Sequence, residues 1–142
     1  MSDDAVIAGF TGEHAFLSNF HPSPLDYEGL TYPTVEHAFQ AAKSTDAADR
    51  LRISLTAKPG QAKRLGRRVA LRPDWERVKL GVMLGLLRLK FERPELRQML
   101  RETGSAELIE VNGWGDRYWG QDRQGNGQNH LGELLVQVRG ER

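Results

Sequence analysis

Residues 34–44 read TVEHAFQAAKS, and the apolar side chains of this stretch recur with the period of an α-helix. Four of them fall on one side of a helical projection: Val35, Ala38, Phe39 and Ala42. Thr34 precedes the first apolar residue and is a favourable N-cap. The pattern predicts a short helix from Val35 to about Ser44 whose apolar side packs against other elements.

A different side of this helix is polar. At 100° per residue, Glu36, Gln40 and Lys43 fall within about 60° of one another. Glu36 and Lys43 are two turns apart, roughly 10 Å along the axis, so they do not pair as i,i+4 neighbours do. That spacing suits groups that face a bound molecule from two ends. Geometry alone, however, favours a simpler interpretation, an exposed face on which Glu36 complements the helix dipole.

Turn residues and periodicity divide the rest of the chain into short elements. Strands are predicted at 6–10 and 107–111, a loop at 13–24, and a hairpin at 25–33 that turns at Glu28-Gly29. Further helices are predicted at 46–56, after Pro59, at 75–91, at 94–102 and around 131–138. The predicted fold class is α+β, a helix-rich single domain over residues 1–142 with a small β component.

The helix expected at 75–91 is apolar almost all round, which is typical of a central helix. Gly81 and Gly85 would let a neighbouring backbone approach it closely. Lys79 is the only charged residue between Arg77 and Arg88. It either lies buried with a partner or, as periodicity favours, extends its ammonium group to water.

Composition excludes several classes of protein. The chain has no cysteine, so disulfides, thiolate nucleophiles and zinc–thiolate sites are excluded. Its start lacks the pattern of a secretory signal, and its longest apolar run, residues 80–87, is too short to cross a membrane. A cytoplasmic location without a membrane partner is expected. The four histidines lack metal-ligand spacing, so no metal is expected either.

The net charge of +1 conceals a strong asymmetry. Residues 50–101 hold 15 Lys/Arg and 4 Asp/Glu, a local charge of +11, whereas the rest of the chain carries −10. A basic segment of this size favours phosphates or nucleic acid as partners. The alternative is a set of solvated helix faces whose long side chains cover apolar surface.

A second candidate site lies in the glycine-rich stretch NGWGDRYWG, residues 112–120. The rings of Trp114 and Trp119 suit stacking on a nucleobase, and Gly120 would let the backbone approach a ligand. Asp116 is a candidate general acid or base, or a partner for a ribose hydroxyl. The alternative is a loop whose tryptophans cover the edge of the core while Asp116 caps a turn.

Five stretches together resemble the NADAR family of YbiA-like proteins: FLSNFHPSP, YPTVEHAFQAAK, DWERVKLGVMLGLLRLKF, NGWGDRYWG and GQNHLGELLVQVR. They occur in the family's order over about residues 10–139. The resemblance implies an enzyme that hydrolyses the N-glycosidic bond at ribose C1′, without a cofactor. The implied substrates are ADP-ribose on guanine, free or in nucleic acid, or phosphoribosylamino-pyrimidine intermediates of riboflavin synthesis. The compact loop of residues 112–120 resembles small stand-alone members and favours ADP-ribose.

The resemblance also assigns roles to matching residues. The expected catalytic residues are Lys43, Glu36 and Asp116. The expected substrate-binding residues are Asn19, Phe20, Gln40, Trp75, Lys79, Trp119 and Gly120. The basic helices between residues 58 and 72 would attract a phosphate or pyrophosphate. The chemistry is either a carboxylate pair acting as acid and base, or attack by the Lys43 amine on C1′ to give a Schiff base. A nucleotide-binding module without turnover is the alternative of another class.

Overall fold

The computed structural model describes residues 5–141, and its helices and short strands confirm the predicted α+β class. The chain divides into two compact units. The central unit is Asn19–Lys90, and the terminal unit joins the residues up to Ser18 to those from Phe91 onward. The single domain expected from the sequence stays a prediction. No helix among residues 5–141 is long and apolar enough to cross a membrane.

The central unit begins with the predicted hairpin. Strands β2 (Leu25–Tyr27) and β3 (Leu30–Tyr32) pair antiparallel, with Leu25 opposite Tyr32. The turn between them has positive φ at both residues, 48° at Glu28 and 92° at Gly29. Two left-handed residues in succession match the twist of the flanking strands, which is why two-residue hairpins prefer this turn.

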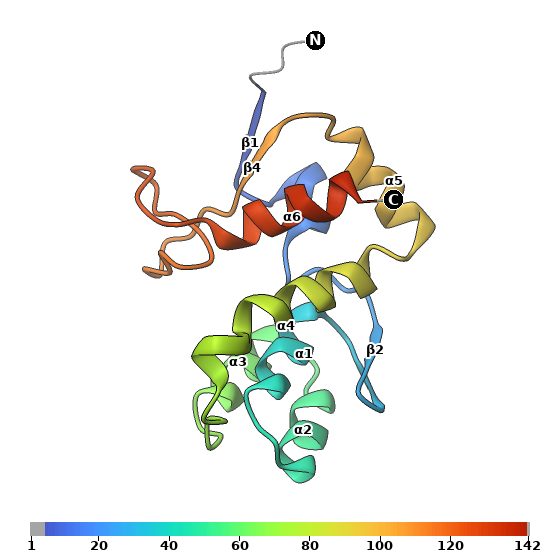
Figure 1. The fold of residues 1–142 in the computed structure, drawn as a ribbon, viewed down its shortest axis with the longest axis vertical. Helices are drawn as coiled ribbons and strands as arrows, with labels where there is room; N and C mark the ends of the chain where they lie inside the picture. Colours follow the sequence, from blue (N-terminus) through green and yellow to red (C-terminus); the bar gives the residue numbers. More distant parts are fainter. Residues whose placement is uncertain (1–4, 142) are drawn as a thin grey trace. The chain divides into compact units, whose positions relative to one another are not determined.

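Four helices complete the central unit: α1 (Val35–Ala42), α2 (Ala47–Ser54), α3 (Pro59–Gly66) and α4 (Trp75–Lys90). Helix α1 packs against the other three, and α4 crosses over it in Figure 1. The predicted cap is present, because the Thr34 hydroxyl accepts a hydrogen bond from the backbone N–H of His37 at 3.1 Å. All eight residues of α1 are buried, so this short helix is the core of the unit.

The prediction that the helix at 75–91 is central was wrong in part. Its buried residues are Trp75, Met83, Leu86, Leu87 and Lys90, which lie on one side. Leu80 is 39% exposed, and Gly81 and Gly85 approach no other described residue closely. Within the unit α1 and β2 cover one side of α4, which leaves a groove of about 410 Å³ beside Tyr27. An all-round apolar pattern does not determine how many elements surround a helix.

The terminal unit is built around a parallel strand pair. Strand β1 (Val6–Ala8) pairs with β4 (Glu107–Ile109), with Ile7 opposite Leu108. Helix α6 (His130–Gly140) packs on β4, and α5 (Pro94–Glu102) packs on α6. A Cβ on Gly132 would overlap the backbone carbonyl of Leu108 in β4, so this glycine allows the close packing of α6 on β4.

The loop predicted at 13–24 is partly helical. Residues Gly12–Leu17 form a 3-10 helix, η1, in which His14 N–H donates to the Thr11 carbonyl at 3.0 Å. Phe16 and Leu17 at its end are buried. Two turns of i→i+3 bonds leave no 3.6-residue period in the sequence, which is why periodicity did not predict this helix.

Candidate active site

The polar side of α1 is buried rather than exposed. Glu36 is 8% and Gln40 5% exposed, and Gln40 Nε2 donates a hydrogen bond to Glu36 Oε2 at 2.6 Å. A buried carboxylate is expensive unless hydrogen-bond donors surround it, so this amide is part of what holds Glu36 in place. The exposed face that geometry alone favoured is therefore wrong for these two residues.

Backbone contacts fix the start of α1 around Glu36. Its N–H, which has no partner inside the helix, donates to the carbonyl of Asn19 at 3.1 Å. Asn19 is itself buried, and its Nδ2 group contacts Met83 Sδ at 3.5 Å. Asn19, predicted to frame the ligand, thus joins the helix that carries Glu36 to α4.

Gly66, the last residue of α3, lies directly on the Gln40 side chain. A Cβ on Gly66 would overlap Gln40 Oε1, and it would lie 2.8 Å from Cδ and 3.0 Å from Cβ of Gln40. Real Cβ atoms do not approach other atoms this closely, so any larger residue here requires the Gln40 side chain or α3 to shift. Gly66 was not predicted from the sequence, because nothing local shows which helix covers the polar side of α1.

Lys43 follows α1 directly as its C-cap and is half-buried. Its backbone is tied down, because its carbonyl accepts from Arg72 N–H at 2.8 Å. Burial lowers the pKa of Lys43, the carboxylate of Glu36 opposes that shift, and the positive charges of Arg67, Lys63 and Lys79 add to it. The amine form of Lys43, which is the nucleophile, therefore becomes accessible at lower pH than for an ordinary lysine.

Three further predicted ligand-binding residues lie in the central unit. Trp75 is buried, with its ring 5.0 Å from that of Phe39 on α1, so core packing already accounts for its position. Phe20 is exposed. The Lys79 ammonium group reaches Glu76 Oε1 at 2.7 Å, so the side chain ends in an ion pair rather than in water alone. Their contacts with substrate stay a prediction.

Asp116, in the loop of the terminal unit, adopts the turn-capping geometry that was the alternative to catalysis. Its Oδ1 atom accepts from the N–H groups of Tyr118 at 3.1 Å and Trp119 at 2.9 Å. Asn112 holds the same turn, accepting from Asp116 N–H at 3.0 Å and donating to its carbonyl at 2.9 Å. One carboxylate oxygen thus has a structural partner, and the catalytic role of Asp116 stays a prediction.

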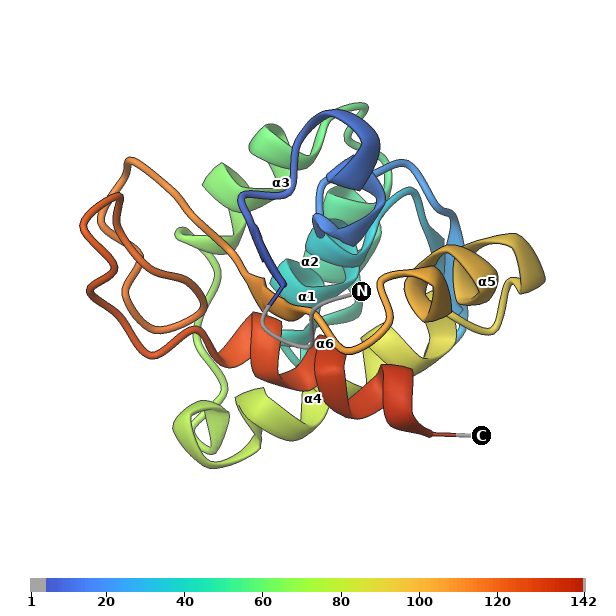
Figure 2. The same cartoon turned by 90° about the horizontal axis from the view of Figure 1, so that it is seen from above.

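The neighbours of Asp116 in this loop differ in burial. Gly120 is buried, and a Cβ there would overlap the Glu110 side chain and lie 2.5 Å from the Glu110 carbonyl. Packing alone therefore requires this glycine. Trp119 is half-buried edge-on against Tyr118, with centroids 4.8 Å apart, whereas Trp114 is 62% exposed. Figure 2 shows the loop extending beyond the N-terminal end of α6.

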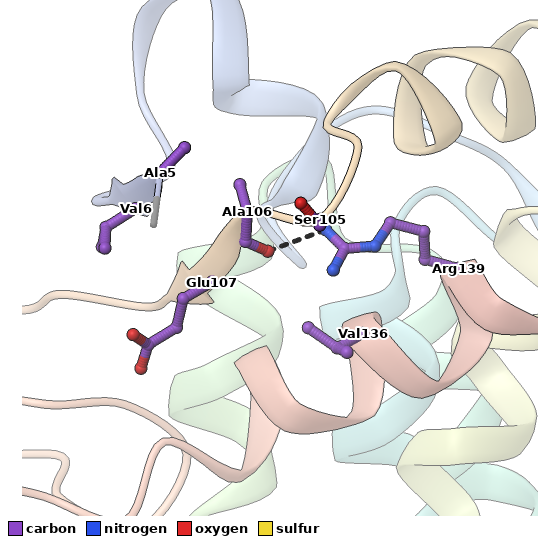
Figure 3. A pocket seen from close by; sticks show the side chains of 7 residues that line it. All are labelled: Ala5, Val6, Ser105, Ala106, Glu107, Val136 and Arg139. Carbon is purple, nitrogen blue, oxygen red and sulfur yellow. Dashed lines mark hydrogen bonds between the residues drawn. The ribbon is translucent and has the colours of Figure 1, made fainter. Parts of the chain in front are cut away.

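The structure thus brings Glu36, Gln40 and Lys43 together within the central unit, while Asp116, Trp119 and Gly120 share one loop of the terminal unit. A separate groove in the terminal unit, of about 400 Å³, contains none of the predicted residues. Figure 3 shows Arg139 across this groove, donating to the Ala106 carbonyl at 2.8 Å. Among the described residues, no three His, Asp or Glu side chains gather as metal ligands would.

Comparison with known proteins identifies the family and the fold of this chain. The NADAR domain matches residues 9–141. The N-glycosidase YbiA of Escherichia coli is 42% identical over 130 residues, which cover 89% of this chain and 81% of that protein. The chloroplastic riboflavin biosynthesis protein PYRR of Zea mays is 38% identical over 143 residues, covering 88% of this chain and 23% of that protein. The NMR structure of E. coli YbiA matches with a TM-score of 0.87 at 40% identity, covering 98% of this chain and 85% of that one.

These relatives confirm the predicted class, a hydrolase that acts on N-glycosyl compounds. More particularly, the chain belongs to the NADAR family. The family resemblance read from the five sequence stretches is thereby confirmed, together with the α+β fold.

Proposed function

We propose that this NADAR-family N-glycosidase hydrolyses the C1′–N bond between ribose and a base, and that its substrate is ADP-ribose attached to guanine, as a nucleotide or within nucleic acid. The observation that supports it is the buried polar side of α1. A carboxylate and a lysine of lowered pKa lie on that one side, with an amide between them that donates to the carboxylate. Cleavage of a glycosidic bond needs a group that acts as acid or base and a nucleophile that attacks C1′.

In the favoured route, Lys43 is the nucleophile. The ribose opens when O4′ takes a proton, and the Lys43 amine adds to C1′. The base then leaves with a proton, so that C1′ and Nζ form an iminium bond. Water adds to that bond, the amine departs, and the sugar is released. Burial of Lys43 supports this route, because an amine attacks only when it is unprotonated.

The second route uses carboxylates alone. One of Glu36 and Asp116 protonates the leaving base, and the other activates water or stabilises the positive charge that develops on the ribose. In this route Lys43 only binds the substrate. Asp116 Oδ1 already accepts two backbone hydrogen bonds, so one of the two carboxylate oxygens has a structural role. We therefore favour the first route.

A second substrate also has support, namely a phosphoribosylamino-pyrimidine intermediate of riboflavin synthesis. Relatives from Zea mays and Vibrio vulnificus are named riboflavin biosynthesis proteins. This chain corresponds to 23% and 35% of their lengths, whereas it spans 81% of E. coli YbiA. Both candidate substrates join a phosphate-bearing ribose to nitrogen, so the same residues would serve either.

The test is a product-release assay with both substrates, an oligonucleotide carrying ADP-ribosyl-guanine and a phosphoribosylamino-pyrimidine, read by mass spectrometry. We expect ADP-ribose release by the wild type and none by Lys43→Ala. Lys58→Ala is the matched control, because Lys58 is an exposed lysine at the start of α3. Borohydride added during turnover should attach the sugar to Lys43. Release of the pyrimidine alone would replace the substrate, and turnover without an adduct at Lys43 would exclude the Schiff-base route.

A further inference from the structure

We propose that Lys63 and Arg67 of the α3 segment bind the phosphate or pyrophosphate of the substrate, forming an anion subsite beside Lys43. This inference rests on the proposed function of the α1 site. Of the many basic residues in the chain, Lys63 and Arg67 would bind the anion. One side of α3 would then contact substrate and the other side would not.

Helix α3 approaches the polar side of α1 closely. Gly66 lies against the Gln40 side chain, and Gln40 donates to Glu36. Lys63 and Arg67 flank Gly66 in sequence, three residues before it and one after. They are four residues apart, so they share one side of the helix and its C-cap. The segment that covers Gln40 therefore brings both charges to the same place.

The charged groups of Lys63 and Arg67 also lie near Lys43. Arg67, Lys63 and Lys79 each lower the pKa of Lys43, which they do only from nearby. Four positive groups, Lys43 among them, thus lie near the polar side of α1, where Glu36 supplies a negative charge and Glu76 pairs with Lys79. Residues 50–73 contain eight Lys/Arg and no Asp/Glu. Carboxylates outside the segment pair with Arg50, Arg52 and Arg72, so its net charge stays positive. Like charges repel, and a bound anion would relieve that repulsion.

The chemistry of the pair suits a phosphate. The Arg67 guanidinium can donate two parallel hydrogen bonds to phosphate oxygens, and the Lys63 ammonium group adds a compact charge. Arg67 is exposed at the end of α3, whereas Lys63 is half-buried. A diphosphate would place one end between these residues and leave its sugar toward Lys43.

The other side of α3 offers a matched control. Arg64 and Arg68 are also four residues apart, but they line a different groove of about 430 Å³ with Leu55, Thr56 and Leu65. The two pairs sit on one segment, differ by one position, and carry the same charge. A diffuse attraction of anions would depend on both pairs about equally, whereas a subsite depends on one.

The experiment compares Lys63→Gln/Arg67→Gln with Arg64→Gln/Arg68→Gln in the full chain, using inorganic pyrophosphate as the probe in calorimetry. Loss of charge-assisted hydrogen bonds should weaken pyrophosphate binding roughly tenfold or more in the first variant and less than about threefold in the second. Equal losses in the two variants, or no binding by the wild type, would overturn the proposal. The single variants Lys63→Gln and Arg67→Gln serve if the double variant does not fold.

A second readout separates this proposal from the proposed function. Pyrophosphate binding requires no turnover, so a subsite can be demonstrated even if neither N-glycoside is cleaved. Where turnover occurs, Lys63→Gln/Arg67→Gln should raise KM more than it lowers kcat, because the pair holds a part of the substrate that does not react. An unchanged KM alongside unchanged pyrophosphate affinity would remove Lys63 and Arg67 from the site.

Discussion

Replacing Gly66 by alanine tests whether α3 positions Glu36, the carboxylate for which we propose a catalytic role. The added Cβ would overlap the Gln40 amide, so either α3 or the Gln40 side chain has to move. Inserting a methyl group into a packed site typically costs about 1–3 kcal/mol. If the amide moves, Glu36 also loses its 2.6 Å hydrogen bond, and bonds to charged groups contribute about 1.5–3 kcal/mol. We expect a destabilisation of roughly 2 kcal/mol if α3 moves, or roughly 4 kcal/mol if the amide moves and its hydrogen bond is lost, and turnover should fall in the second case.

Gly60→Ala is the matched control for this prediction. Gly60 lies on the same helix, and a Cβ there would meet no other described residue within 4 Å. Alanine favours a helix over glycine by about 1 kcal/mol, so Gly60→Ala should leave activity unchanged and slightly raise the melting temperature. Thermal unfolding by circular dichroism measures both variants, alongside the release assay.

The double variant Gly66→Ala/Gln40→Ala distinguishes a local clash from a general effect on α3. Removing the Gln40 amide makes room for the new methyl group, so Gly66→Ala should cost much less stability in that background than alone. Activity should stay low, because Glu36 still lacks its amide donor. Additive stability losses, or a Gly66→Ala enzyme with full activity and stability, would refute the reasoning.

Three further predictions concern single groups. The pKa of Lys43 is lowered from 10.5, so the kcat of the Schiff-base route should rise with pH, with the midpoint of the rise below 10.5. Lys63→Gln/Arg67→Gln should move that midpoint to higher pH. A kcat that is independent of pH from 6 to about 10 would contradict this prediction. Burial lowers the pKa of Lys90 to about 7. Between that pH and about 10.5 the unfolded chain binds a proton that the folded chain does not. The free energy of unfolding of the wild type should therefore rise by up to about 1.4 kcal/mol per pH unit relative to Lys90→Met, as measured by denaturant titration. Parallel pH dependence of the two proteins would contradict a lowered pKa at Lys90. Asp116→Asn keeps an oxygen acceptor for the turn, so we expect an unchanged melting temperature. Turnover should fall roughly 100-fold if Asp116 is an acid or base. Full turnover would show that Asp116 has a structural role only.

Most of the helix boundaries, caps and turns of this fold were predicted from the sequence. Helix α5 begins and ends as predicted, Thr34 caps α1, and Glu28-Gly29 turns the hairpin, because caps and turns depend on adjacent residues. The pairing of β1 with β4 was not predicted, since no local pattern specifies a partner about 100 residues away.

The candidate site shows the same division between local and distant information. Helical periodicity placed Glu36, Gln40 and Lys43 on one side, but it could not show that Gly66 covers that side and buries it. Lys90 was missed although a signal existed. It follows Met83 by seven residues and shares the buried side of α4 with Leu86 and Leu87, which the period of the helix already implies. Asp116 was ambiguous, because a turn cap and a catalytic acid require the same residue.

The parallel pair of β1 and β4 has a consequence for the synthesis of the chain. A ribosome releases β1 long before β4, and all of residues 19–90 emerge in the interval. The contacts of the central unit lie within that interval, so its helices can assemble while β1 still lacks its partner. A compact central unit then replaces a long flexible loop and lowers the entropy cost of closing the strand pair. Until β4 is made, the backbone of β1 has no strand partner and is open to pairing with another molecule.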